Sequence, residues 1–208
     1  MLFQNHLFID KCNEKFKKNI NFLFDDIDQK IILDFGCGTN KIYNYIKFNK
    51  YYLYDPIINE HLIDHHNINK KIKIIESLVS ISNLNDEIDI VFMNSVIQYI
   101  DNVEFNNIIK IIFAKNKKIK IVISDVPKFN RFKEFFLIPF FNLNNAFYIY
   151  SNIFQNCFQK SYFNLPYYFY SKKKIRRMIN DLDLDLDLEF MNNYYISNTR
   201  YSLVIKAK

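Results

Sequence analysis

The sequence predicts an α/β fold, in which helices cover both faces of a doubly wound, mostly parallel sheet. Three observations lead to this prediction. Five short runs are apolar almost throughout, as in strands that are buried on both faces. Stretches suited to helices separate these runs, and the alternation continues for about a hundred residues. Half of the 208 residues are hydrophobic, so the chain can form one domain, 1–208, around a single core.

The first two regions supply most of the expected elements. Residues 1–29 have apolar positions at helical spacing, which predicts a leading amphipathic helix over 2–24. Residues 30–126 form the expected core. Its predicted strands are Ile31–Leu33, Tyr51–Tyr54, Ile72–Ile75, Ile88–Met93 and Ile119–Ile123. The predicted crossover helices are Lys41–Lys47, Ile57–His66 and Val103–Ala114.

The segment 127–170 interrupts this alternation. It is rich in aromatic residues and poor in charges, so it is too apolar to be disordered and too long for a plain loop. We expect an insertion after the fifth strand, which either forms a lid over the substrate pocket or only extends the core. The last region, 171–208, predicts a helix over Lys172–Ile179 and strands over Leu188–Met191 and 200–208.

The only two glycines of the chain, Gly36 and Gly38, directly follow the first predicted strand in the stretch IILDFGCGTN. Such a turn lets a ligand approach the backbone closely. A dinucleotide fingerprint would need a third glycine where Lys41 stands, and the P-loop pattern is absent. The carboxylate of Asp34 would repel a pyrophosphate but attract an ammonium group.

This stretch resembles the D-x-G-x-G loop of class I S-adenosylmethionine-dependent methyltransferases. The resemblance implies a Rossmann-like sheet of seven strands and S-adenosyl-L-methionine as the cofactor. It also implies that Asp34 receives the methionine ammonium group and that the two glycines lie against the cofactor. The loop residues implied to bind the cofactor are Asp34, Phe35, Gly36, Cys37 and Gly38.

The ends of the next three strands agree with the family pattern. Asp55, in YYLYDP, resembles the acid that binds the ribose hydroxyls, and Glu76 stands near the family's usual aspartate before the adenine site. NSVI follows the fourth strand, where many enzymes that act on base amines have an N/D-P-P-Y-type tetrapeptide. The further cofactor-binding residues implied are Asp55, Pro56, Ser77, Leu78, Asn94 and Ser95.

The methyl acceptor is less well defined by the sequence. A small molecule, such as a sugar, a lipid precursor or another metabolite, is the first hypothesis, because an aromatic cover suits a compact substrate. An RNA methyltransferase is the alternative, supported by the net charge of +6 and by SKKKIRR at 171–177. A non-catalytic accessory protein that retains the fold is the third. No catalytic residue is assigned, and the candidates near the strand ends are Gln98, Tyr99 and Asp125.

Other patterns exclude further classes of site. His61 and His65 have helical spacing but no third ligand nearby, and the alternating acids of 181–189 lack the glycine of a calcium loop, so no metal is expected. The alternation predicts a loop that leads into a half-buried strand. Three widely spaced cysteines fit a reducing cytoplasm, and no apolar run is long enough to span a membrane.

Overall fold

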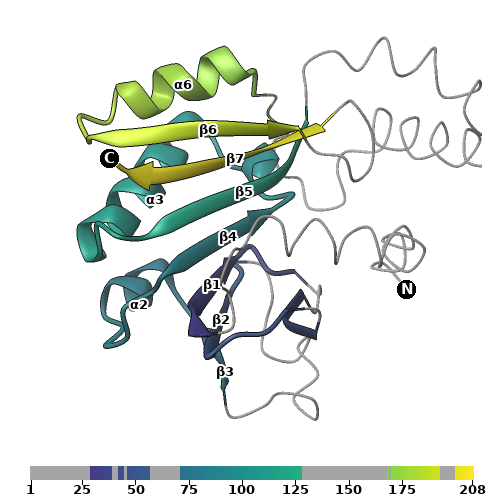
Figure 1. The fold of residues 1–208 in the computed structure, drawn as a ribbon, viewed down its shortest axis with the longest axis vertical. Helices are drawn as coiled ribbons and strands as arrows, with labels where there is room; N and C mark the ends of the chain where they lie inside the picture. The colour runs from purple at the N-terminus through teal and green to yellow at the C-terminus, as the bar shows by residue number, and fades with distance from the viewer. Residues whose placement is uncertain are drawn as a thin grey trace, which may run out of the picture.

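The computed structural model describes residues 29–38, 42–44, 46–56, 71–127, 168, 170–192 and 200–208. Within this part, seven strands form one sheet in the order β3-β2-β1-β4-β5-β7-β6, and β7 alone runs antiparallel to its neighbours (Figure 1). The predicted seven-stranded, mostly parallel α/β fold is therefore confirmed. The strands are β1 (Ile31–Phe35), β2 (Lys50–Tyr54), β3 (Ile72–Ile75), β4 (Ile90–Asn94), β5 (Lys120–Pro127), β6 (Leu186–Asn192) and β7 (Arg200–Ala207).

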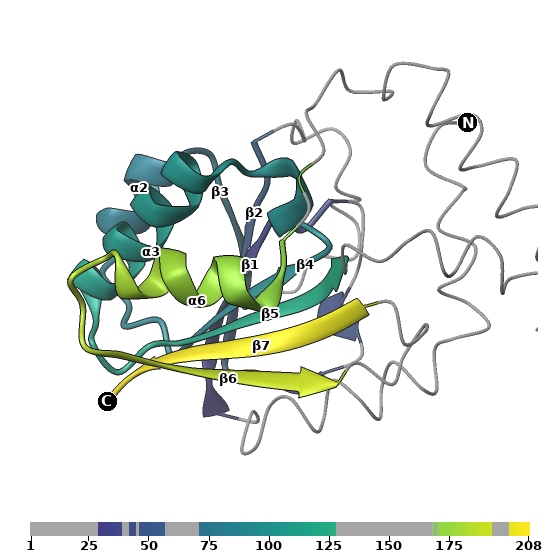
Figure 2. The same ribbon diagram turned by 90° about the horizontal axis from the view of Figure 1, so that it is seen from above.

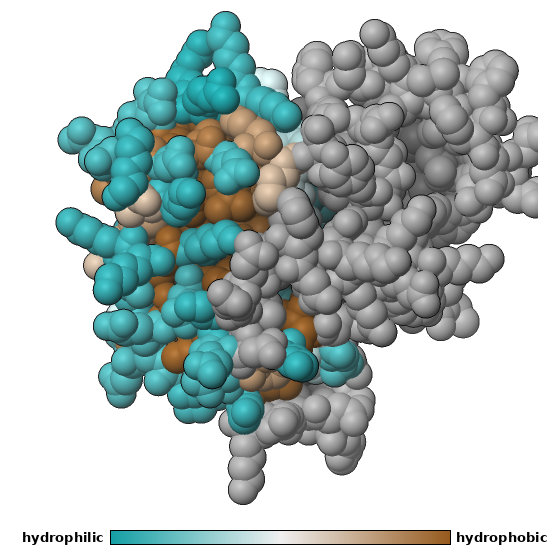
Figure 3. Space-filling model, in the orientation of Figure 1, coloured by the Kyte–Doolittle hydropathy of each residue, from teal (hydrophilic) through white to brown (hydrophobic). Residues whose placement is uncertain are grey.

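The α-helices of the described part lie on the same face of the sheet (Figure 2). They are α2 (Leu78–Ser82), α3 (Asn102–Lys115) and α6 (Lys172–Asn180). Residues that point to the opposite face, among them Ile32, Phe92 and Val122, are also buried. Hydrophilic side chains surround the described part and hydrophobic ones gather toward its middle (Figure 3).

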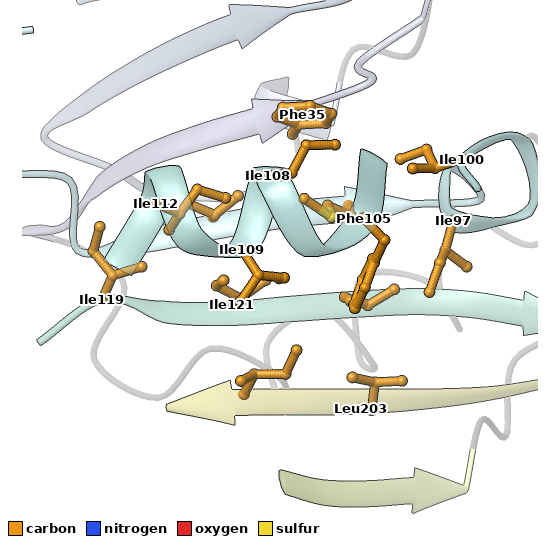
Figure 4. Close-up of a cluster of buried hydrophobic side chains, with 14 of the residues drawn as sticks. Phe35, Ile97, Ile100, Phe105, Ile108, Ile109, Ile112, Ile119, Ile121 and Leu203 are labelled. Atoms are coloured by element: carbon orange, nitrogen blue, oxygen red, sulfur yellow. The ribbon is translucent and has the colours of Figure 1, made fainter. Parts of the chain in front are cut away.

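Helix α3 shows how the sequence forms these elements. The side chain of Asp101 accepts a hydrogen bond of 2.8 Å from the backbone N–H of Glu104, which caps the first turn. Apolar residues then recur at helical spacing and face the sheet (Figure 4). The buried residues of α3 are Phe105, Ile108, Ile109, Ile112 and Phe113.

The structure differs from the predicted elements in three places. The expected helix Lys41–Lys47 is, in its described residues, only a 3-10 helix over Ile42–Asn44, because the connection from β1 to β2 is short. Helix α2 was not predicted, since one buried residue, Ile81, leaves no apolar period to detect. Strand β5 extends to Pro127, past a bulge between Ile123 and Val126.

Several predictions fall outside the described residues. These are the leading helix 2–24, the crossover helix Ile57–His66 with its two histidines, and nearly all of the aromatic insertion 127–170. The loop that leads into a half-buried strand is present at β6. Among the described residues, no helix is both long and apolar enough to cross a membrane.

The strand order places a topological switch point between β1 and β4. From β1 the chain continues to β2 and β3 on one side, and from β4 it continues to β5 on the other. In open parallel sheets, ligands bind at the carboxyl ends of the strands at such a point. The residues that follow β1, β2, β4 and β5 are therefore the candidates for a site.

Candidate functional site

The glycine loop after β1 is fastened to the end of β2 by its backbone. The N–H groups of Gly36 and Cys37 donate to the carbonyl oxygen of Tyr54 at 2.7 and 3.1 Å. The N–H of Gly38 donates to Oδ2 of Asp55 at 2.9 Å. Consecutive N–H groups of the loop thus point to one neighbouring strand end, which fixes the path of the turn.

The two glycines are required for different reasons. Both have left-handed backbones, with φ of +75° at Gly36 and +53° at Gly38. A Cβ atom at Gly36 would lie 2.4 Å from Cγ2 of Val96, so this residue allows the loop to pack on the turn after β4. A Cβ atom at Gly38 would have no atom of the described residues within 4 Å, so one side of this residue is open within that part of the chain.

Asp34 is a buried carboxyl group at the end of β1, and only 1% of its surface is exposed. The hydroxyl of Tyr51 donates to its Oδ2 at 2.9 Å, whereas Oδ1 has no hydrogen-bond partner among the described residues. Burial raises the pKa of Asp34 to about 7; the hydrogen bond from Tyr51 acts in the opposite direction, and the charge of Asp55 raises it further. A cationic ligand at Oδ1 would favour the ionised form.

The other loop residues are fixed by packing. The ring of Phe35 packs on that of Tyr54, with 4.8 Å between centroids, and belongs to the core beneath the helices. The free thiol of Cys37 is buried, and burial raises its pKa, with the charges of Asp34 and Asp55 adding to the effect. A thiol that stays protonated is not a nucleophile. Only the backbone of these residues can therefore serve a ligand.

The predicted residues on β2 and β3 lie at the same edge of the sheet. Asp55 is half-buried and Pro56 is exposed directly after β2. Beyond β3, Glu76 and Ser77 are exposed, and the hydroxyl of Ser77 caps α2 by accepting from the N–H of Ser80 at 3.2 Å. Leu78 is the first residue of α2 and packs against the core. The side chain of Ser77 is thus engaged within the protein.

Two of the residues singled out from the sequence, one directly after β4 and one at the bulge of β5, form a strained pair that the sequence did not predict. Ser95 and Asp125 have left-handed backbones, with φ of +58° and +62°. The Ser95 hydroxyl donates to Oδ2 of Asp125, and the Ser95 N–H donates to the carbonyl of Ser124 at 3.1 Å. Asn94, the last residue of β4, pairs in register with Ser124. Such strain and β-bulges are common at functional sites.

Gln98 and Tyr99, the other two candidates for a catalytic residue, differ in exposure. Gln98 is buried, while 40% of Tyr99 is exposed. The carbonyl of Gln98 accepts from the N–H of Tyr168 at 2.7 Å, and the hydroxyl of Tyr170 donates to the carbonyl of Ile100. The last residues of the aromatic insertion are thereby attached to the turn after β4. The insertion begins at the end of β5, so both of its described ends lie at the carboxyl edge.

Charged groups are arranged differently at the two edges of the sheet. At the amino edge, Nζ of Lys30 lies 3.6 Å from Oδ1 of Asp89, and Lys50 forms an ion pair with Asp86. At the carboxyl edge, Asp34, Asp55 and Asp125 lie around the switch point, and Glu76 follows β3 farther along the same edge. This acidic edge, with an open glycine loop, suits a ligand that offers an ammonium group and hydroxyl groups.

Comparisons with known proteins agree with this architecture. A family model described as a methyltransferase domain matches residues 6–187. No curated protein sequence matches the chain. Among solved structures, the chain is similar to a SAM-dependent methyltransferase from Archaeoglobus fulgidus, with 14% identity, a TM-score of 0.59, and coverage of 98% of this chain and 99% of that one.

Two further solved structures are also similar to the chain. One is a magnesium protoporphyrin IX methyltransferase from Synechocystis PCC 6803 with bound SAH, with 12% identity, a TM-score of 0.56, and coverage of 95% and 83% of the two chains. The other is the methyltransferase domain of bacterial CtHen1-C, with 13% identity, a TM-score of 0.56, and coverage of 94% and 98%. At these identities the likeness concerns the fold.

Proposed function

The chain belongs to the class I S-adenosylmethionine-dependent methyltransferases, and on this basis we propose that it methylates a small-molecule acceptor, such as a sugar, a lipid precursor or another metabolite. S-adenosylmethionine is the cofactor. It supplies a methyl carbon that its sulfonium group already makes electrophilic. The main task of the protein is then to hold cofactor and acceptor in line.

The observation that carries the proposal is that Oδ1 of Asp34 has no hydrogen-bond partner in the part of the chain that the structure describes. A buried carboxylate oxygen without a hydrogen bond is costly, so its retention calls for a ligand. The ammonium group of the cofactor's methionine part is such a ligand. The open side of Gly38 adds room for that part of the cofactor beside the same loop. The residues present therefore fit the cofactor.

Asp55 is the second acid that we assign to the cofactor. One of its oxygens, Oδ2, holds the N–H of Gly38 and so fixes the loop. We assign the carboxylate also to the ribose hydroxyls of the cofactor, which offer two donors at the end of β2. The remaining residues that we assign to the cofactor line the same edge: Pro56, Ser77, Leu78, Asn94 and Ser95. The hydroxyls of Ser77 and Ser95 form hydrogen bonds within the protein. We therefore assign the backbone groups of these two residues, and not their hydroxyls, to contacts with the cofactor.

On the acceptor side, Asp125 is the best of the three candidates. It is a carboxylate at the end of β5, fixed by the hydroxyl of Ser95 and by a backbone conformation that needs support from its surroundings. A hydroxyl acceptor needs a group that takes its proton, and a carboxylate can do so. Gln98 has no basic group, and 40% of Tyr99 is exposed.

The basic run of α6 favours a small acceptor over RNA. The ammonium group of Lys172 lies 5.3 Å from the ring centre of Phe190, and the guanidinium of Arg176 lies at the same distance from that ring. Lys174 lies 4.4 Å from the ring centre of Tyr170. Three of the five cations thus cover aromatic rings of the protein. The net charge of +6 still supports RNA as the alternative.

Methyl transfer from isotope-labelled S-adenosylmethionine tests the acceptor class. The protein is incubated with low-molecular-mass metabolites and, separately, with total RNA from the same cells. We expect label in the metabolite fraction and only background in RNA, with the Asp34→Ala variant as the control for background. Label in RNA would favour the RNA methyltransferase. Label in neither fraction, with the cofactor bound, would favour a non-catalytic accessory protein.

A further inference from the structure

Among the described residues, Tyr51 is the one whose side chain is bonded to the carboxyl group of Asp34. It lies on β2, is completely buried, and donates its hydroxyl to Oδ2 at 2.9 Å. We propose that Tyr51 is a positioning residue: it holds one oxygen of Asp34, so that the other, Oδ1, is presented to the ammonium group of the cofactor. This inference rests on the proposed function and adds a residue that the D-x-G-x-G pattern does not contain.

The surroundings of Tyr51 fix its hydroxyl. Its ring lies 5.9 Å from that of Tyr43 and 5.1 Å from that of Phe48, measured between centroids. Tyr43 and Tyr51 belong to the core on the face opposite to the helices, and Phe48 packs against it. A ring that packs against two others in a buried core has little freedom to follow a moving carboxylate, so the carboxylate takes the orientation that the hydroxyl imposes.

A purely structural explanation leaves one observation unexplained. A buried tyrosine hydroxyl needs an acceptor, and a backbone carbonyl would serve at less cost than a desolvated carboxylate. Asp34 instead has one satisfied oxygen and one without a partner among the described residues. This half-satisfied state is what a binding group needs before its ligand arrives.

The electrostatics agree with the geometry. The described titratable groups around Asp34 are Tyr51 on β2, Asp55 after β2 and Cys37 in the loop, with Tyr43 next to Tyr51. Burial raises the pKa of the Tyr51 hydroxyl well above its usual value, so it stays a donor. Its hydrogen bond lowers the pKa of Asp34, which burial otherwise raises. Tyr51 therefore keeps the ionised carboxylate accessible near neutral pH.

The test measures the binding of S-adenosylhomocysteine as a function of pH, in the wild type and in Tyr51→Phe. Because ionised Asp34 binds the ammonium group, affinity should rise as pH increases through the pKa of Asp34, and fall where the ligand's amino group loses its proton. Without the hydroxyl, the pKa of Asp34 rises. We expect the acid limb of the profile to move up by about one pH unit while the alkaline limb stays in place.

The matched control is Tyr52→Phe. Tyr52 is the residue next to Tyr51 on β2, and its hydroxyl contacts Asp86 instead of Asp34. This variant should leave both limbs unchanged. A merely structural role of Tyr51 would lower affinity equally at every pH and would not move the acid limb. An unmoved acid limb in Tyr51→Phe, with the wild type binding normally, would overturn the inference alone.

If the wild type binds no S-adenosylhomocysteine at any pH, the proposed function fails, and the inference fails with it.

A measurement on the wild type makes the test independent of the variant's folding. Without ligand, the carboxyl ¹³C signal of Asp34 should titrate well above the usual range of an aspartate, and S-adenosylhomocysteine should shift this titration to lower pH. A signal that the ligand does not move would overturn the assignment of Asp34 to the ammonium group, and the inference about Tyr51 with it.

Discussion

Gly36 and Gly38 share a left-handed backbone but meet different surroundings. The Cβ of an alanine at Gly36 would overlap both methyl groups of Val96, whereas at Gly38 it would meet no atom of the residues that the structure describes. Gly36 therefore allows the loop to pack on the turn after β4, and Gly38 allows a ligand to approach the loop. The pattern of two glycines in a sequence does not distinguish these roles, because it contains no information about the turn opposite.

Gly36→Ala should lower the free energy of unfolding by about 2–4 kcal/mol, through overpacking and backbone strain together. Gly38→Ala should cost only about 1–2 kcal/mol, from the backbone alone, while weakening the binding of S-adenosylhomocysteine more strongly. Urea unfolding and calorimetry measure the two effects. Adding Val96→Ala should recover part of the stability in Gly36→Ala but none in Gly38→Ala; equal recovery in both would contradict this account.

The left-handed backbone of Ser95 gives a second residue-scale prediction. Ser95→Gly and Ser95→Ala both remove the hydroxyl that binds Asp125, but only the glycine relieves the backbone. The glycine variant should therefore be the more stable by about 1 kcal/mol, measured by urea unfolding. At an ordinary helix or strand position the order is reversed, since alanine is favoured by roughly 0.5–1 kcal/mol. An alanine variant that is the more stable would mean that the strain is absent.

At the scale of elements, α6 shows why a basic run is ambiguous in a sequence. Cations in the first turn of a helix are disfavoured by its dipole, which suggests that they have another purpose. The structure places Lys172 and Arg176 over Phe190 of β6, and Lys174 over Tyr170. The partners come from outside the helix, so no pattern within SKKKIRR could predict them.

Two matched double variants separate packing from nucleic-acid binding. Lys172→Gln with Arg176→Gln should lower the free energy of unfolding by about 1–2 kcal/mol, because neither side chain can then place a cation over the ring of Phe190. Lys173→Gln with Arg177→Gln removes the same charge and should change stability by less than about 0.5 kcal/mol, since these residues cover no ring within the described part. Urea unfolding compares the two pairs.

The same variants report on RNA. If RNA is the acceptor, neutralising Lys173 and Arg177 should weaken RNA binding and reduce the log–log salt slope by about one for each phosphate that these residues bind. We expect no change in slope. A reduced slope would support the RNA methyltransferase in place of a small-molecule enzyme.

Prediction from the sequence succeeded where the signal is local. Apolar runs located every strand of the sheet to within a few residues, and the glycine loop located the switch point. The hydrogen bonds of the site could not be predicted, because they depend on how the strands pair with one another. Tyr51 reaches Asp34 only through the pairing of β2 with β1, and the hydrogen bond of Ser95 with Asp125 joins β4 to β5. The capped but short α2 has too few apolar residues to be detected.

At the scale of the whole molecule, the two edges of the sheet have separate tasks. The ion pairs of Lys30 with Asp89 and of Lys50 with Asp86 lie where the strands begin and hold neighbouring elements together. The acids where the strands end lie around the switch point, and Oδ1 of Asp34 has no hydrogen-bond partner among the described residues. The fold thus places its stabilising charges away from the edge where a ligand would bind.

The central claim is that this edge binds S-adenosylmethionine through Asp34 and Asp55. Calorimetric titration of the isolated protein with S-adenosylhomocysteine and, separately, with NAD tests it most directly. The account predicts one site for S-adenosylhomocysteine and no response to NAD. Asp34→Ala and Asp55→Ala should each weaken binding by at least about tenfold, since a hydrogen bond to a charged group contributes roughly 1.5–3 kcal/mol. Tight binding of NAD, with no heat from S-adenosylhomocysteine, would contradict it.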